Sequence, residues 1–184
     1  WVQKSLDVTF EEAVALRQAY LHRYGTTLGG LTAEHQVDVD DYLAFVHDIP
    51  IERYVRPNPR LAAMLSAIPL CKAVFTNATS EHAWRVLRAL DVADRLEWVV
   101  GIREVDFNNK PRLEAYQRLL AFLHAQGPDC ILVEDRVVNL RPGKRLGMTT
   151  VLVDATPEEE VDFAVGDVLE VGPLVARLLE AQND

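Results

Sequence analysis

The chain is short of several features that would assign it to a large class of proteins. No apolar run approaches the roughly 18 residues that cross a bilayer, so we expect no membrane partner. Two cysteines occur in 184 residues, too few for a disulfide framework. Lysine and arginine number 19 against 28 acidic residues, for a net charge of −9. Without a basic stripe interleaved with aromatics, a nucleic acid polymer is not an expected partner either.

The cysteines and the N-terminus bear on compartment and processing. Cys71 and Cys130 lie in or beside apolar runs, which predicts buried free thiols ahead of a disulfide or a reactive thiol. Free thiols fit a reducing, cytoplasmic setting. The chain opens on Trp1 with neither an initiator methionine nor a signal-peptide pattern, which predicts a processed, trimmed or incomplete sequence. No repeat is present, and nothing indicates an oligomeric state.

Residues 1–68 carry the signals of helices. Thr9 and Glu12 form a capping box ahead of the first long helix, and Gly25 ends that helix. Asp38 starts a second helix, and Asn58 followed by a proline starts a third. Residues 25–30, which hold three glycines, are predicted to be the most flexible stretch.

From residue 70 onward strand and helix patterns alternate, which predicts an α/β fold with a Rossmann-like parallel sheet flanked by helices. We divide the chain into a helical region, 1–68, and an α/β core, 69–184. The expected strands are Cys71–Thr76, Trp98–Gly101, Cys130–Glu134, Thr149–Val153 and a short last strand, Val168–Val171. The expected helices are Ser80–Leu90, Pro111–Gln126, Val138–Leu146 and Pro173–Ala181.

Two acids follow directly on a buried strand. Glu134 and Asp135 end the apolar run that begins at Ile131, and ligands of parallel sheets bind at the carboxyl ends of the strands. Two carboxylates so close repel each other unless a cation lies between them. Mg²⁺ prefers such hard oxygen ligands, so we predict that these acids hold Mg²⁺. In isolation, the pair would instead be read as two solvated loop acids.

A hydroxyl, an amide and an ammonium are the candidate phosphate ligands. Thr76 and Asn77 follow the run Val74-Phe75, ahead of a helix whose own caps are Thr79 and Ser80. A hydroxyl and free backbone N–H groups before a helix suit an anion. Lys110 precedes a proline and could neutralise a phosphate and a carboxylate together. Taken alone, each has a simpler interpretation: Thr76 as a helix cap and Lys110 as an exposed surface residue.

Three further residues are weaker candidates. Asn139 follows Asp135 by four residues and could hydrogen-bond the acid pair, although a lone asparagine more often caps the following helix. His47 and His82 are the histidines to watch, against the simpler interpretation of a structural or surface role.

These motifs together resemble those of the haloacid dehalogenase-like hydrolases, and within them the pyrimidine 5′-nucleotidase group. The superfamily likeness lies in Val74-Phe75-Thr76-Asn77-Ala78, Asn109-Lys110-Pro111, Val133-Glu134-Asp135-Arg136-Val137-Val138-Asn139-Leu140 and Leu146–Val153. The likeness to the nucleotidase group lies in Tyr24–Leu31, Asp41–Asp48 and His82–Leu87. Each motif is weak alone, but their order and spacing over residues 5–155 are specific.

The resemblance implies a parallel α/β sheet with a small α-helical cap, to which residues 1–68 would correspond. It implies Mg²⁺-dependent hydrolysis of a phosphomonoester, here a pyrimidine nucleoside 5′-monophosphate, through an aspartyl-phosphate. Thr76 and Asn77 would bind the phosphoryl oxygens, Lys110 would stabilise the charge, and Glu134 and Asp135 would hold the metal. The stretch 25–30 would help to close the cap over this small-molecule substrate.

One essential part of the family pattern is missing. The first motif, an Asp-x-Asp on the first strand, should precede the cap, and no such segment occurs. Asp7 has no apolar strand before it and no second aspartate at Thr9, so we do not accept Asp7 as the nucleophile. The missing strand is the middle of the family's sheet, between those ending at Thr76 and Glu134. Arg136 is a smaller departure, at a position where a small residue is usual.

Three hypotheses follow. In the first, the chain is a phosphomonoester hydrolase whose nucleophile-bearing strand lies outside the sequence as given. In the second, it is a catalytically inactive module that binds nucleotide or phosphate. In the third, the scaffold performs a related reaction, dehalogenation or phosphosugar mutation. Dehalogenation needs no Mg²⁺, so the paired acids disfavour it.

Overall fold

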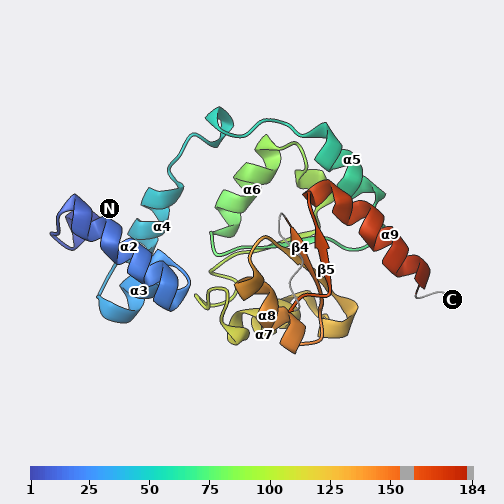
Figure 1. Ribbon diagram of the computed structural model, residues 1–184. Helices are drawn as coiled ribbons and strands as arrows, with labels where there is room; N and C mark the ends of the chain where they lie inside the picture. Colours follow the sequence, from blue (N-terminus) through green and yellow to red (C-terminus); the bar gives the residue numbers. More distant parts are fainter. Residues whose placement is uncertain (154–159, 182–184) are drawn as a thin grey trace.

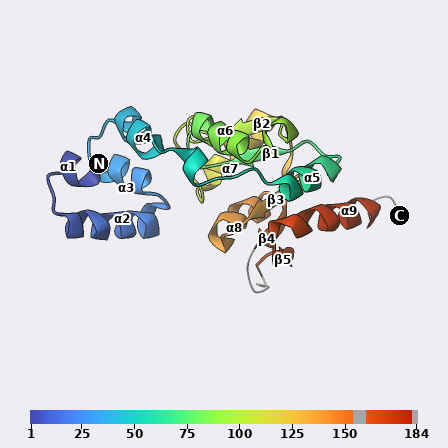
Figure 2. The ribbon, with the colours of Figure 1, turned by 90° about the horizontal axis from the view of Figure 1, so that it is seen from above.

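The computed structural model describes residues 1–153 and 160–181 (Figure 1). Its first part is helical, with the elements α1 (Val2–Ser5), α2 (Phe10–Tyr24), α3 (Thr27–Glu34), α4 (Val39–His47), a 3-10 turn η1 (Ile51–Arg53) and α5 (Pro59–Ala67). We call α1–α4 the N-terminal helical unit. Figures 1 and 2 both show α1–α3 at the opposite end of the molecule from α9 and the C-terminus.

The remaining elements alternate between strand and helix. In chain order they are β1 (Ala73–Phe75), α6 (Ser80–Ala89), η2 (Ala93–Arg95), β2 (Trp98–Val100), α7 (Leu113–Leu123), η3 (Gly127–Asp129), β3 (Ile131–Glu134), α8 (Val137–Arg145), β4 (Thr149–Val153), β5 (Phe163–Val165), η4 (Val168–Glu170) and α9 (Val171–Ala181). The predicted α/β class is thereby confirmed.

The strands form two parallel sheets. β1 pairs with β2, from Ala73 opposite Trp98, and β3, β4 and β5 form a second sheet in that order. In the part of the chain that the structure describes, no strand pairing joins β1 to β3. This break lies where the sequence predicts a missing central strand, between the strands that end near Thr76 and Glu134.

Side-chain alternation along the strands separates two layers of helices. Val74 and Val99 belong to the apolar cluster of α5 and α6, whereas Phe75 and Val100 belong to that of α7. β4 contributes Val151 to the cluster of α9. Because successive strand residues point to opposite faces, α5, α6 and α9 cover one face and α7 covers the other, as Figure 1 also shows.

Local capping explains where the N-terminal helices begin. The Thr9 side chain accepts from the Glu12 N–H in a complete capping box, and the Asp38 carboxylate caps α4. The Asn58 side chain accepts from the Leu61 N–H at the start of α5. These predicted caps are confirmed. The boundary at residues 68 and 69 stays a prediction, and because α5 packs with the core cluster of α6, its contacts favour a boundary before α5.

Three expectations are wrong. The stretch 25–30 is not a flexible loop, because Thr26 caps α3 and Gly29 and Gly30 are buried within that helix. The last strand is β5, since residues 168–170 form a 3-10 turn that the Asp167 side chain caps. Cys71, which precedes β1, is exposed and not buried as expected. Cys71 and Cys130 are both free, and Cys130 is half-buried. No described helix is long and apolar enough to cross a membrane.

Candidate active site at the carboxyl ends of the strands

The Lys110 ammonium joins the two sheets. Its Nζ lies 2.7 Å from Glu134 Oε2, at the end of β3, and 3.0 Å from the Phe75 carbonyl oxygen, at the end of β1. The Lys110 and Glu134 side chains are only 12% and 11% exposed. A positive charge is therefore held, largely out of water, in the break between the sheets.

The Lys110 backbone is held as firmly as its side chain. Its N–H donates to Asn77 Oδ1 at 2.7 Å, and its carbonyl accepts from Asn77 Nδ2 at 3.2 Å. The same carbonyl accepts from Asn109 Nδ2 at 2.8 Å. The Asn77 side chain thus contacts the Lys110 backbone through both of its polar groups, with one hydrogen bond from each.

Thr76 lies beside Lys110, at the end of β1. Its N–H donates to the Val100 carbonyl at 3.0 Å, which continues the β1–β2 ladder, and its hydroxyl oxygen accepts from the Ala78 N–H at 3.0 Å. The hydroxyl hydrogen takes no part in this bond and can be donated to another acceptor. Thr76 and Lys110 thus lie close together at one rim, and their predicted roles toward phosphate stay predictions.

Glu134 and Asp135 also lie at this rim. A hydrogen bond with the Glu134 side chain lowers the pKa of Asp135, and the nearby positive charges of Lys110 and Arg136 lower it further. No group of three or more possible metal-binding side chains occurs in residues 1–153 and 160–181. Two carboxylates suffice, however, for a Mg²⁺ that keeps several waters and takes its other ligands from a phosphate. The donor set present therefore fits Mg²⁺.

Sequence reasoning missed two residues of the site. Asn109 is 3% exposed and bridges Lys110 to the Tyr24 carbonyl of the helical unit. Tyr116, fully buried on α7, donates its hydroxyl to the Asn139 carbonyl in α8 and packs edge-on against Phe75. The only sequence signal for Asn109 is its place directly before Lys110, and Tyr116 reads as an ordinary apolar residue of α7.

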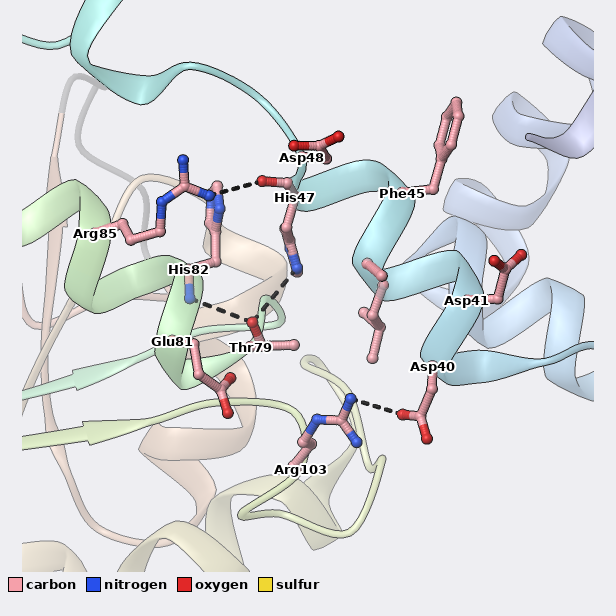
Figure 3. A pocket seen from close by; sticks show the side chains of 12 residues that line it. Asp40, Asp41, Phe45, His47, Asp48, Thr79, Glu81, His82, Arg85 and Arg103 are labelled. Carbon is pink, nitrogen blue, oxygen red and sulfur yellow. Dashed lines mark hydrogen bonds and ion pairs between the residues drawn. The ribbon is translucent and has the colours of Figure 1, made fainter.

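A pocket of about 650 Å³ lies between α4 and α6 (Figure 3). Its charged lining residues are Asp40, Asp41, Asp48, Glu81, Arg85 and Arg103. The rings of His47 and His82 stack in this pocket, with centroids 4.2 Å apart. The Arg85 guanidinium donates to the backbone carbonyls of His47 and Ile49. The two histidines singled out in the sequence are therefore brought together at the junction between the helical unit and α6.

The histidine pair is kept neutral. Burial and, after it, the neighbouring His82 ring lower the pKa of His47 from 6.5 to about 4. Glu81 opposes this shift in part, and Arg85 adds a smaller lowering effect. Burial and Arg85 also lower the pKa of His82. His82 Nδ1 is buried without a hydrogen-bond partner among the described residues. Protonation of either ring would place a cation beside the other ring and beside Arg85, which disfavours the stack.

Mild acid is therefore expected to destabilise the protein through His47. The unfolded chain binds protons while the folded ring stays neutral, so the free energy of unfolding falls as the pH drops below 6.5 and levels off near 4. For these partly exposed rings we expect a loss of about 1 kcal/mol between about pH 7 and about pH 5, reduced for solvent screening. Urea unfolding of His47→Phe at both pH values should show a smaller loss than wild type. His22→Gln, at an exposed site on α2, is the control, and an equal loss in His47→Phe would contradict the assignment.

The comparisons with known proteins agree with this geometry. A family model described as haloacid dehalogenase-like hydrolase matches residues 8–147. Phosphate metabolism protein 8 of Saccharomyces cerevisiae is 26% identical over 162 residues, which cover 77% of this chain and 49% of that protein. The chain thus spans about half the length of the curated relative that it matches.

Solved structures show the same fold. An L-2-haloacid dehalogenase from Xanthobacter autotrophicus superimposes with a TM-score of 0.61 at 16% identity, over 96% of this chain and 80% of that one. A phosphatase from Thermococcus onnurineus gives a TM-score of 0.61 at 14% identity, over 95% and 84%. Because the family model covers most of the sequence, the chain belongs to the haloacid dehalogenase-like hydrolases.

Proposed function

We propose that this chain is the phosphate-handling part of a Mg²⁺-dependent phosphomonoester hydrolase. The observation that carries the proposal is the Lys110 ammonium, held between the Phe75 carbonyl and Glu134 in the break between two sheets. An ammonium fixed there, with little exposure to water, stabilises the negative charge of a phosphoryl group more strongly than it would in bulk solvent. Thr76, at the same rim, supplies a hydroxyl donor to a phosphoryl oxygen.

The nucleophile of the proposed reaction is an aspartate on a strand that this sequence does not contain. Among the described residues, no strand pairs with β1 or β3 across the break, and this supports that part of the proposal because a strand placed there would complete one parallel sheet. Its carboxylate would attack phosphorus and the ester P–O bond would break. A second acid would protonate the departing oxygen, and water would then cleave the aspartyl-phosphate to orthophosphate.

Asp135, together with the Glu134 oxygen that Lys110 does not hold, would bind Mg²⁺. The metal would supply charge neutralisation for the phosphate and its orientation. Lys110 would keep Glu134 in place through the ion pair and compensate the excess charge of two adjacent carboxylates. Asn77, whose side chain is engaged by Lys110, would contribute its backbone to the phosphate site.

The substrate class proposed is a pyrimidine nucleoside 5′-monophosphate, which rests on the motif resemblance. The pocket between α4 and α6 supports a leaving group of nucleoside size, since its volume is about 650 Å³ and Thr79, three residues after Thr76, lines it. Its paired imidazole rings and carboxylates offer stacking and hydrogen bonds to a planar base. The N-terminal helical unit would serve as the cap over this substrate.

The test is orthophosphate release from UMP, CMP and AMP by the longest natural form of the protein that carries this chain. We expect Mg²⁺-dependent release, faster from UMP and CMP than from AMP, that falls by at least about 100-fold with EDTA or in Asp135→Asn. Asp129→Asn, a remote acid in the turn before β3, is the matched control and should leave the rate unchanged.

Two other outcomes have defined meanings. A nucleotide-induced rise in melting temperature without orthophosphate release would replace the hydrolase by an inactive binding module. Halide release from a haloacid that resists EDTA would replace it by a dehalogenase. Absence of all three responses would refute the assignment of the site to phosphate.

A further inference from the structure

We propose that Asn109 is a positioning residue that ties the placement of Lys110 to the seating of the N-terminal helical unit. The inference rests on the proposed role of Lys110. Asn109 Nδ2 donates to two carbonyls at once, that of Tyr24 at 2.8 Å and that of Lys110 at 2.8 Å. An amide nitrogen has two hydrogens, so the Asn109 side chain uses both of its donors, one on the helical unit and one on the Lys110 backbone.

The corner between α2 and α3 is built to approach this asparagine closely. Gly25 ends α2 with φ at +80°, and a Cβ added there would lie 2.8 Å from both the Lys110 carbonyl oxygen and Pro111 Cδ. A Cβ on Gly29 would lie 3.0 Å from Asn109 Oδ1. The corner can therefore rest on the Lys110–Pro111 backbone only because these positions have no side chain.

Three segments that are distant in sequence thus meet at the Lys110 backbone. Asn77 comes from the end of β1, Asn109 precedes Lys110, and Tyr24, 85 residues from Asn109, comes from the helical unit. If the helical unit moves away, Asn109 loses the Tyr24 carbonyl and one of the two constraints on its amide. The Lys110 carbonyl is then held less firmly, and its ammonium loses the fixed position between Phe75 and Glu134. Through Asn109, the position of the Lys110 ammonium therefore depends on whether the N-terminal helical unit is packed against the core.

Asn109→Asp is the sharpest variant, because it keeps the shape of the side chain and replaces the double donor by an acceptor facing two carbonyls. We expect kcat to fall by about 100-fold and KM to stay within about threefold of wild type, since misplacement of a charged group lowers the rate more than it weakens ground-state binding. Acidification should restore part of the rate in Asn109→Asp, because protonation returns one donor, but none in Asn109→Ala. If Asn109 served only to fill space, the isosteric aspartate would leave kcat unchanged.

The matched control is Asn108→Asp. The Asn108 amide also donates to two carbonyls, those of Val105 and Asp106, but both belong to its own loop. The same chemical change made one residue earlier should therefore leave kcat within about threefold of wild type. An equal loss in both variants would overturn the proposal, because it would show a general requirement for loop folding.

A second readout needs no substrate. The Lys110 ammonium, shielded by its bonds to Glu134 and Phe75, should give a slowly exchanging NMR signal from 15Nζ-labelled lysine, assigned by its loss in Lys110→Met. We expect this signal to broaden or vanish in Asn109→Asp and in Gly25→Ala, and to persist in Asn108→Asp. Gly147→Ala is the control for backbone strain, because Gly147 has φ at +85° and its nearest contact is Pro128.

Persistence of the wild-type signal in Asn109→Asp would overturn the inference, whatever the enzymatic result. Failure of the proposed function is distinguishable, since in that case wild type releases no orthophosphate while the NMR comparison among the variants still reports on Lys110. Circular dichroism identifies any variant that has not folded, and for such a variant the decision rests on Asn109→Ala against Asn108→Ala with the same two readouts.

Discussion

Replacement of Lys110 by methionine is expected to lower the free energy of unfolding by about 3 kcal/mol. The methionine keeps an apolar stem near the Phe75 ring, whose centroid lies 5.1 Å from Nζ, but it removes the ammonium from the break between the sheets. The Glu134 carboxylate, 11% exposed, is then left charged without its partner, and the Phe75 carbonyl loses a donor. Urea unfolding followed by circular dichroism measures the difference.

Two further variants separate this effect from a general loss of a surface lysine. Glu134→Gln added to Lys110→Met removes the unpaired charge, and we expect it to recover about 2 kcal/mol. Lys144→Met breaks an ion pair with Asp162 whose side chains are 40% and 35% exposed, and should cost less than about 1 kcal/mol. Equal losses of unfolding free energy in Lys110→Met and Lys144→Met, or no recovery in the double variant, would mean that the Lys110–Glu134 ion pair is not shielded from water.

The elements around the rim could be predicted because their signals are local. The two apolar runs that end near Thr76 and at Glu134 form the strands β1 and β3, and parallel pairing brings the carboxyl ends of strands to one edge. The position of Thr76 and Glu134 beside Lys110 follows from that rule and from the break between β1 and β3. The sequence indicated His47 and His82 only as two separate candidates. It did not predict that they stack, because no local pattern shows that α4 packs against α6.

What the sequence could not reveal depends on contacts across long separations. Three glycines in residues 25–30 favour a loop by local propensity, yet they belong to a helix corner that packs on other segments. A Cβ on Gly30 would lie 2.1 Å from Tyr20 Cγ, so glycine serves there for close packing. The Asn109–Tyr24 bond joins residues 85 apart, and no pattern around either residue announces the other. Tertiary packing, here, overrides propensity.

Gly127→Ala is expected to be strongly destabilising, although it adds only one methyl group, in the turn before β3 and at the opposite end of that strand from the acid pair. A Cβ at Gly127 would lie 1.7 Å from the Leu146 carbonyl oxygen and 2.7 Å from its carbon. These are backbone atoms of the turn into β4, so they cannot move aside as a flexible side chain can. The turn feeds the ladder in which the Thr149 N–H donates to the Cys130 carbonyl, and relief of the clash must displace β3 or β4.

We expect the variant to lose at least about 4 kcal/mol of unfolding free energy, measured by urea denaturation. Gly166→Ala is the matched control, because a Cβ there meets nothing within 4 Å and its effect should stay within about 1 kcal/mol of zero. Since β3 carries Glu134, the Gly127 variant should also lose the slowly exchanging Lys110 ammonium signal even where it remains folded. A Gly127→Ala protein as stable as Gly166→Ala would show that β3 and β4 do not meet this turn as closely as the structure places them.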